Sequence, residues 1–212
     1  MRRNRLVLIA VMALALATLA CNALASRFQP AQPPAPQGPT PTPGAPEPTP
    51  GPAGQSPLKI GDGPTIGAPR ETRVAVEEQT QILEQLAEEQ YDQDALAVVG
   101  ETFTFTIQLD ESKRLLWVFG WCAASADLVE QNLQGMTVEF SVNGTPVDLG
   151  QFHVVDGQSG DLPCRYYLAV VYDWPSGPTQ LEVRVTFNEL VNDGLSEYPS
   201  GSQWFIYDVT AP

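Results

Sequence analysis

The sequence has one histidine and lacks the short motifs of common catalytic sites. It contains no Gly-x-Ser-x-Gly nucleophile elbow, no His-Glu-x-x-His zinc motif and no glycine-rich phosphate loop. His153 lies in or at the end of a predicted strand, where a lone histidine is usually structural. A carboxylate pair of the glycosidase type stays open, because its separation is spatial. We therefore expect no catalytic residue, no metal site and no cofactor, and we predict that the protein is not an enzyme.

Basic residues are also scarce, with 11 Lys and Arg against 25 Asp and Glu. Removal of an N-terminal leader carrying three of the arginines would leave 8 basic residues and a net charge of −17. Such a surface would repel phosphate backbones, so nucleic acid is disfavoured as a partner. A charge of this size favours a soluble monomer.

Long hydrophobic runs are limited to residues 6–20, fifteen residues without a charge. This run is at the short edge of what a membrane-spanning helix requires. It follows an arginine-rich start at residues 1–5, and the two together are typical of a secretory signal.

The apolar run ends at Thr18-Leu19-Ala20-Cys21, which resembles the lipobox of bacterial lipoproteins. The resemblance implies that residues 1–20 are a signal peptide and that a lipid on Cys21 anchors the chain to the cell membrane. The rival cleavage site Ala23-Leu24-Ala25 would instead release a secreted protein that starts at Ser26. Either outcome predicts an extracytoplasmic location.

Cysteine is nearly absent, with three residues in the chain. Lipidation of Cys21 would leave Cys122 and Cys164, which could pair in an oxidising compartment. A disulfide between them would close a 42-residue loop and stabilise the fold by about 4 kcal/mol. Two separate buried thiols are the alternative.

Proline, in contrast, is abundant between residues 30 and 69, where it fills fourteen of forty positions. Repeated proline fixes φ and removes backbone donors, which predicts an extended spacer with polyproline II character. We assign residues 21–70 to a disordered tether. A proline-rich recognition ligand is the sharper alternative.

Residues 71–91 carry apolar side chains at helical spacing, among them Ile82, Leu83 and Leu86, with glutamates between them. They predict one short amphipathic helix with Thr72 as N-cap. The helix and its connector, residues 71–98, either dock on the following domain or pair with another chain as a stalk.

Residues 99–212 show the two-residue period of β-strands. Seven strands are predicted at residues 102–109, 115–123, 136–142, 145–155, 164–173, 180–187 and 203–210. A short helix is expected at residues 125–134, and Asn143-Gly144 is a strong hairpin signal. We predict an all-β, antiparallel seven-stranded sandwich.

The chain resembles bacterial lipoproteins that carry a Pro-rich tether and an immunoglobulin-like C-terminal β-sandwich. The resemblance is carried by Cys21-Asn22 after the leader, residues 118–122, Cys164 and residues 173–177. It implies a sandwich fold without implying a particular ligand.

Two surfaces are candidates for function. If Cys122 faces inward, then Trp117 and Trp121 face outward, and with Tyr167 they could form a platform for a polysaccharide or an envelope protein. The alternative is that the predicted helices cover this face. Residues 156–161 and the polar loop after residue 187 offer oxygen ligands for calcium, although ordinary turn chemistry also explains them.

Two functions remain open. One is a membrane-tethered extracytoplasmic binding or adhesion module for a protein or polysaccharide, and the other is a structural envelope lipoprotein with no discrete ligand.

Overall fold

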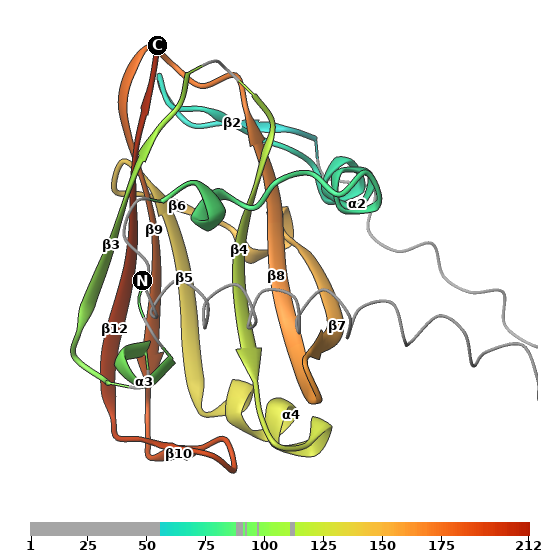
Figure 1. The fold of residues 1–212 in the computed structure, drawn as a ribbon, viewed down its shortest axis with the longest axis vertical. Coiled ribbons are helices and arrows are strands. Elements are labelled where there is room, and N and C mark those ends of the chain that lie inside the picture. Colours follow the sequence, from blue (N-terminus) through green and yellow to red (C-terminus); the bar gives the residue numbers. More distant parts are fainter. Residues whose placement is uncertain (1–55, 88–90, 92, 97, 111–112) are drawn as a thin grey trace, which may run out of the picture. The chain divides into compact units, whose positions relative to one another are not determined.

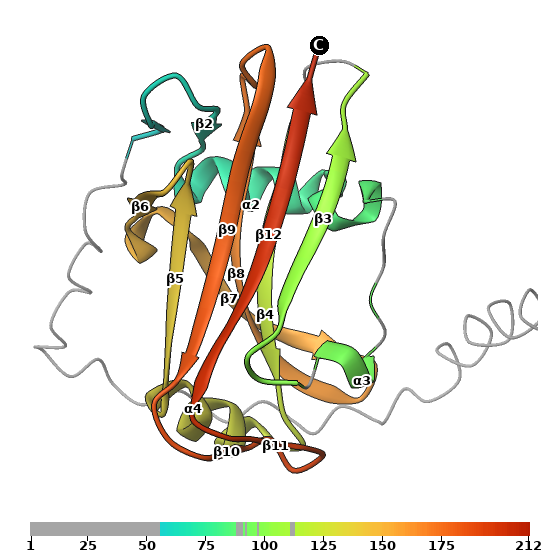
Figure 2. The ribbon, with the colours of Figure 1, turned by 90° about the vertical axis from the view of Figure 1, so that its left-hand side faces the viewer.

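The computed structural model describes residues 56–212 except 88–90, 92, 97 and 111–112 (Figure 1). Cys21, the leader and most of the predicted tether lie outside the described residues. The described chain is mostly β, and two sheets pack face to face around one apolar core (Figures 1 and 2). The predictions of a β-rich fold and of a sandwich are confirmed.

Each of the two large sheets has five strands. Sheet A contains β1 (Leu58–Lys59), β2 (Thr65–Ile66), β8 (Leu162–Tyr172), β4 (Leu115–Cys122) and β7 (His153–Ser159). Sheet B contains, in order, β3 (Thr102–Gln108), β12 (Gly201–Ala211), β9 (Gly177–Phe187), β5 (Met136–Val142) and β6 (Thr145–Val147). A small hairpin joins β10 (Val191–Asn192) to β11 (Glu197–Tyr198).

The topology differs from the prediction of seven antiparallel strands. The C-terminal strand β12 pairs parallel with β3, with Tyr207 opposite Phe105. Strands β3 and β12 are therefore related by a crossover connection, which the sequence pattern did not indicate. All other strand pairs in the two sheets are antiparallel.

The hairpin at Asn143-Gly144 is confirmed, because both residues have positive φ, 49° and 76°, as a type I′ turn requires. The strand predicted at residues 145–155 is divided instead. A short 3-10 helix, η2 (Leu149–Gln151), follows β6, and Asp148 caps it by accepting a hydrogen bond from the Gly150 N–H at 2.7 Å. The chain then enters the other sheet as β7.

The helix predicted at residues 125–134 is confirmed as α4 (Ala126–Gln134). The Ser125 hydroxyl accepts a hydrogen bond from the Leu128 N–H, and the helix ends at Gly135.

The single helix predicted at residues 71–91 is wrong. Helix α2 (Pro69–Glu77) begins two residues earlier and ends where Gln79 adopts a left-handed conformation with φ 56°. The Thr80 N–H then donates to Ala75 O, and the Gln79 N–H to Val76 O, which is the Schellman arrangement. The apolar residues beyond this stop lie in an extended segment and in the 3-10 helix η1 (Leu83–Leu86), which is followed by a short helix, α3 (Gln93–Leu96).

Segment 81–87 closes one side of the sandwich, between the edges of β3 and β4 (Figure 1). The Leu116 N–H donates to Gln81 O at 2.9 Å, and Leu83 is buried in the core. The side chain of Glu84 accepts a hydrogen bond from the Tyr207 hydroxyl of β12. This segment therefore contacts both sheets.

The folded domain also includes part of the predicted tether. Strands β1 and β2 join sheet A, and Ile66 is fully buried. The buried side chain of Gln151 donates hydrogen bonds to the backbone oxygens of Ser56, Ile66 and Gly67. Because this segment is rich in proline, the sequence analysis did not predict these two-residue strands. No helix among the described residues is long and apolar enough to cross a membrane.

Candidate functional site

Cys122 and Cys164 form the predicted disulfide, but it lies within one sheet. The two residues are direct partners in the β4–β8 pair, with their Cα atoms 4.0 Å apart. Even-numbered residues of β4 turn their backbone groups away from β8, as the bond from Leu116 to Gln81 shows. The disulfide therefore occupies a closely spaced, non-hydrogen-bonded pair. A disulfide fits an extracytoplasmic location.

The predicted facing of β4 is reversed. Odd-numbered residues point into the core between the sheets, and Trp117 and Trp121 have exposures of 0% and 7%. The Trp117 ring packs edge-on against Phe140, and the Trp121 ring against Tyr198. Tyr167 packs against the same core, so the platform predicted from Trp117, Trp121 and Tyr167 is wrong. Neither indole N–H has a hydrogen-bond partner among the residues that the structure describes.

The outer face of sheet A carries the even-numbered residues of β4 and β8, and helix α2 covers part of it. Ala75 of the helix packs against Leu116 and Val170. The buried Thr72 hydroxyl accepts a hydrogen bond from the Val170 N–H at 3.0 Å. Thr72 is thus an anchor of the helix on the sheet and not its N-cap. The expectation that helices cover the side of Trp117 and Trp121 is wrong, because that side packs into the core between the sheets. Helix α2 lies on the opposite side of sheet A, and α4 contacts β8, β5 and the β10 hairpin.

The part of this face beyond α2 holds an aromatic ring between two glycines. Tyr166 of β8 lies opposite Gly120 of β4, and Gly157 of β7 flanks its other side. A Cβ at Gly120 would lie 2.7 Å from Tyr166 Cδ1, and a Cβ at Gly157 would lie 3.2 Å from Cε2. The ring therefore occupies the space that side chains at these positions would fill. We call Tyr166, Gly120, Gly157 and the adjacent Val155 the Tyr166 face.

The strand beside this face, β7, is the exposed edge of sheet A (Figure 1). Six of its seven residues are exposed and His153 is half-buried, so β7 is solvent-accessible on both faces. Val154 and Val155 have exposures of 46% and 37%. The segment 156–161, predicted as an acidic loop, is for the most part this strand and its turn.

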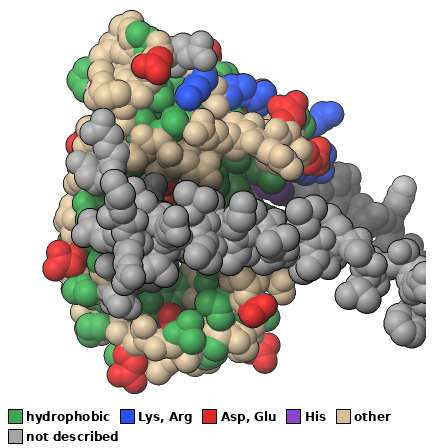
Figure 3. Space-filling model, in the orientation of Figure 1, with side chains coloured by type: hydrophobic (Ala, Val, Ile, Leu, Met, Phe, Trp, Pro, Cys, Tyr) green, Lys and Arg blue, Asp and Glu red, His purple; other side chains and the backbone are tan. Residues whose placement is uncertain are grey.

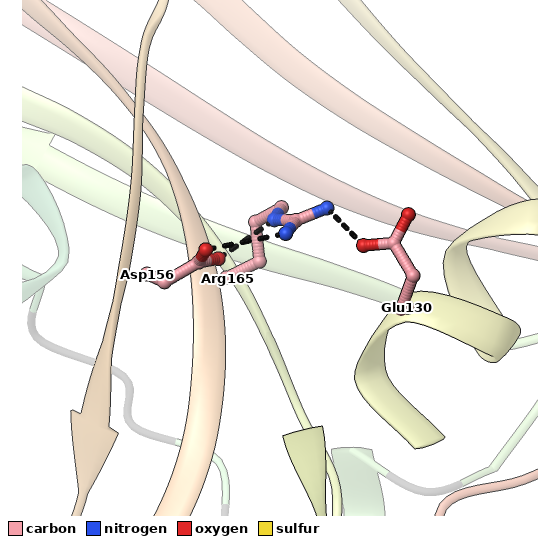
Figure 4. Close-up of polar contacts among 3 residues, drawn as sticks. All are labelled: Glu130, Asp156 and Arg165. Atoms are coloured by element: carbon pink, nitrogen blue, oxygen red, sulfur yellow. Dashed lines mark hydrogen bonds and ion pairs between the residues drawn. The ribbon is translucent and has the colours of Figure 1, made fainter. Parts of the chain in front are cut away.

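An ion-pair network holds β7 in place (Figure 4). Arg165 of β8 donates two hydrogen bonds to Asp156 of β7, the shorter at 2.7 Å, and one to Glu130 of α4 at 2.8 Å. The hydrogen bond from Arg165 lowers the pKa of Asp156, and the two carboxylates raise the pKa of Arg165. The network ties three elements together at the surface.

A shallow hollow of about 340 Å³ lies between the first turn of α2 and the start of β7. Pro69, Arg70, Arg73 and His153 line it. Arg70 makes no ion pair with any residue that the structure describes, and Arg73 makes one with Glu77 at 3.7 Å. Figure 3 shows Lys and Arg side chains gathered around α2 in a domain with many exposed carboxylates.

The second candidate calcium loop follows β9. The Asp193 carboxylate accepts hydrogen bonds from the Leu195 and Ser196 N–H groups, both at 2.7 Å, and from the Tyr198 hydroxyl at 3.0 Å. This is turn chemistry. Burial and the Asp193 charge raise the pKa of Tyr198. In the described part of the chain, no three His, Cys, Asp or Glu side chains are grouped to hold a metal ion.

Comparisons with known proteins give little further information. No family model matches the chain, and no curated protein matches it. A chain in the solved structure of PbICP-C in complex with falcipain-2 is similar over 52% of this chain and 89% of its own length. The identity is 11% and the TM-score 0.30, a level of similarity that gives no basis for a shared function.

The sequence did not indicate the Tyr166 face. The assumption that the cysteines face the core would also turn Tyr166, two residues after Cys164, inward, and ordinary turn chemistry was one explanation offered for residues 156–161. The available signal was the occurrence of Gly120 inside a strand, because a strand glycine often marks a place where another group approaches closely.

Proposed function

We propose that the protein is a membrane-tethered extracytoplasmic binding module with an immunoglobulin-like β-sandwich, anchored by a lipid on Cys21. The domain presents the Tyr166 face to a protein or polysaccharide partner outside the membrane. The disulfide and the signal-like N-terminus support the location. The binding role depends on one observation, the aromatic ring set between two glycines where α2 leaves sheet A uncovered.

A binding role agrees with the chemistry of this face. A tyrosine ring offers an apolar surface for a sugar ring or a protein side chain, and its hydroxyl supplies a polar contact. The two glycines keep neighbouring side chains away from the ring. The disulfide stands beside it in the same sheet and fixes β4 to β8.

Two measurements test the proposal. Mass spectrometry of the mature protein should find a diacylglyceryl group on Cys21, and the Cys21→Ser variant should lose it. A benzophenone cross-linker placed at position 166 on intact cells should give a discrete adduct, whereas the same group at the exposed Thr137 of β5 should not. An unlipidated chain starting at Ser26 would overturn the anchor. Equal or absent adducts at both positions would overturn the binding face and favour a structural envelope role.

A further inference from the structure

The free edge of β7 carries unpaired backbone groups. The even-numbered residues of β8 direct their backbone N–H and C=O groups toward the side where β7 lies. The Val170 C=O, for example, accepts a hydrogen bond from the Gly67 N–H on this side of β8. The β7 residues opposite even-numbered β8 residues are odd-numbered, for example Val155 opposite Tyr166. These odd-numbered residues are the ones hydrogen-bonded to β8. Val154, Asp156 and Gln158 therefore direct their N–H and C=O groups outward, where no described residue accepts or donates.

Such an edge is a template for another strand. Natural edges are usually blocked by lysine, proline, an inward-pointing charge or a covering element. The sequence of β7, His-Val-Val-Asp-Gly-Gln-Ser, has no lysine or proline, and the charge of Asp156 is paired with Arg165. The bonds from Arg165 to Asp156 hold the strand in its extended form. Little ordering of β7 is then needed when a second strand pairs with it.

Charge along the edge identifies the partner. The start of β7 carries His153 and lies beside Arg70 and Arg73, and Asp156 stands at the middle of the strand. An antiparallel partner fits when it is basic at its start and carries an acidic residue a few positions later, which is the order along β7 itself. We propose that two copies of this chain pair through antiparallel β7 strands about a two-fold axis.

Register follows from the side chains. Outward-facing residues are even-numbered, and a two-fold axis near the middle of the strand can pass through Val155, Asp156 or Gly157. An axis through Asp156 places two carboxylates directly opposite each other, which is unfavourable. An axis through Gly157 pairs two residues that have no side chains to contact each other. An axis through Val155 instead pairs Val155 with its copy and Asp156 with Val154, and we assign this register.

The dimer rests on the proposed function in one respect only, its consequence for binding. Pairing would place two Tyr166 faces on one continuous sheet. The contact is small, and the net charge of −17 that remains without the leader opposes it at long range, so a weak dimer is expected in free solution. Confinement of anchored chains to one membrane raises their effective concentration and favours pairing.

Sedimentation velocity of the full mature chain with Cys21→Ser, from roughly 10 µM to 1 mM, tests the dimer. We expect a concentration-dependent dimer and, by NMR, slower amide exchange at Val154 and Asp156 as it forms. The amides of Val155 and Gly157 should not change. A chain that stays monomeric throughout, or protection elsewhere, would overturn the proposal.

Four variants test the pairing and its register. Val155→Lys places two lysines opposite each other and should weaken the dimer about tenfold. The same substitution at Val74, an equally exposed valine on α2, should have no effect. Val154→Lys, opposite Asp156 of the second copy, should not weaken the dimer, and Val154→Pro, which removes an outward N–H directed at the backbone of Asp156 in the second copy, should. Equal effects of the two β7 lysines would overturn the register. Loss of the dimer with persistence of the position-166 adduct would overturn β7 pairing and leave the binding module standing.

Discussion

The Tyr207 hydroxyl of β12 donates a hydrogen bond to the side chain of Glu84 in η1. The bond joins sheet B to the segment that closes the side of the sandwich. Burial raises the pKa of Glu84 above its ordinary value of 4.5, and the bond from Tyr207 offsets part of this rise. Burial also raises the pKa of Tyr207 well above 10, so its hydroxyl keeps the proton that it donates.

Glu84→Gln should make the domain more stable relative to the parent chain as the pH rises. Below 4.5, Glu84 is protonated in both the folded and the unfolded chain. As the pH rises, the unfolded chain loses this proton first, so the parent loses stability until the pH passes the raised pKa of the folded state. Urea unfolding of both proteins between pH 3 and about 8 measures the difference.

Tyr207→Phe is the control for this effect. It removes the bond that favours the charged carboxylate, so the pKa of Glu84 should rise further and the loss of stability should extend to higher pH. A stability difference between Glu84→Gln and the parent that does not depend on pH would contradict the burial of this carboxylate.

Replacement of both Cys122 and Cys164 by alanine should lower the free energy of unfolding by about 4 kcal/mol on the chain-entropy model of a 42-residue loop. Because the disulfide lies on the outer face of sheet A, the variant should keep Trp117 and Trp121 shielded. Acrylamide quenching of the folded variant should match that of the parent. Newly quenched tryptophan would place the disulfide in the core between the sheets.

The strands with one solvent-exposed face were predictable from the sequence. Phe103, Phe105 and Ile107 alternate with threonines, and this period fixes both the strand and its buried side. The cap at Ser125 and the turn at Asn143-Gly144 are local signals that need no distant contact. The disulfide followed from counting cysteines.

The facing of β4 could not be predicted in the same way. Leu115 to Phe119 is apolar on both sides, because one side meets the core and the other meets α2. No polar residue marks the outer side, and the assumption that Cys122 points to the core selected the wrong one. The sequence did not indicate the Tyr166 face for the same reason, because polar and apolar residues do not alternate clearly there. The end of α2 was missed because it depends on Gln79 in a conformation that glycine usually adopts.

Gly120→Ala should destabilise the domain by about 1 to 3 kcal/mol, because the new methyl group would lie 2.7 Å from the Tyr166 ring. Tyr166→Ala removes the obstacle, so the double variant should recover most of this loss. Chemical unfolding of the four proteins gives the coupling between the two positions. Additive losses would show that the ring does not rest on Gly120.

Thr72→Val should lower the free energy of unfolding by about 1 to 3 kcal/mol, since it leaves the buried N–H of Val170 without an acceptor. Valine keeps the shape of threonine, so the loss reports the hydrogen bond. Thr72→Ser is the matched control, because it keeps the hydroxyl and removes only a methyl group. Amide exchange separates the two variants: the Val170 N–H should exchange faster with valine at position 72 and stay protected with serine. Equal exchange in both would mean that α2 is held on sheet A by the packing of Ala75 against Leu116 and Val170 alone.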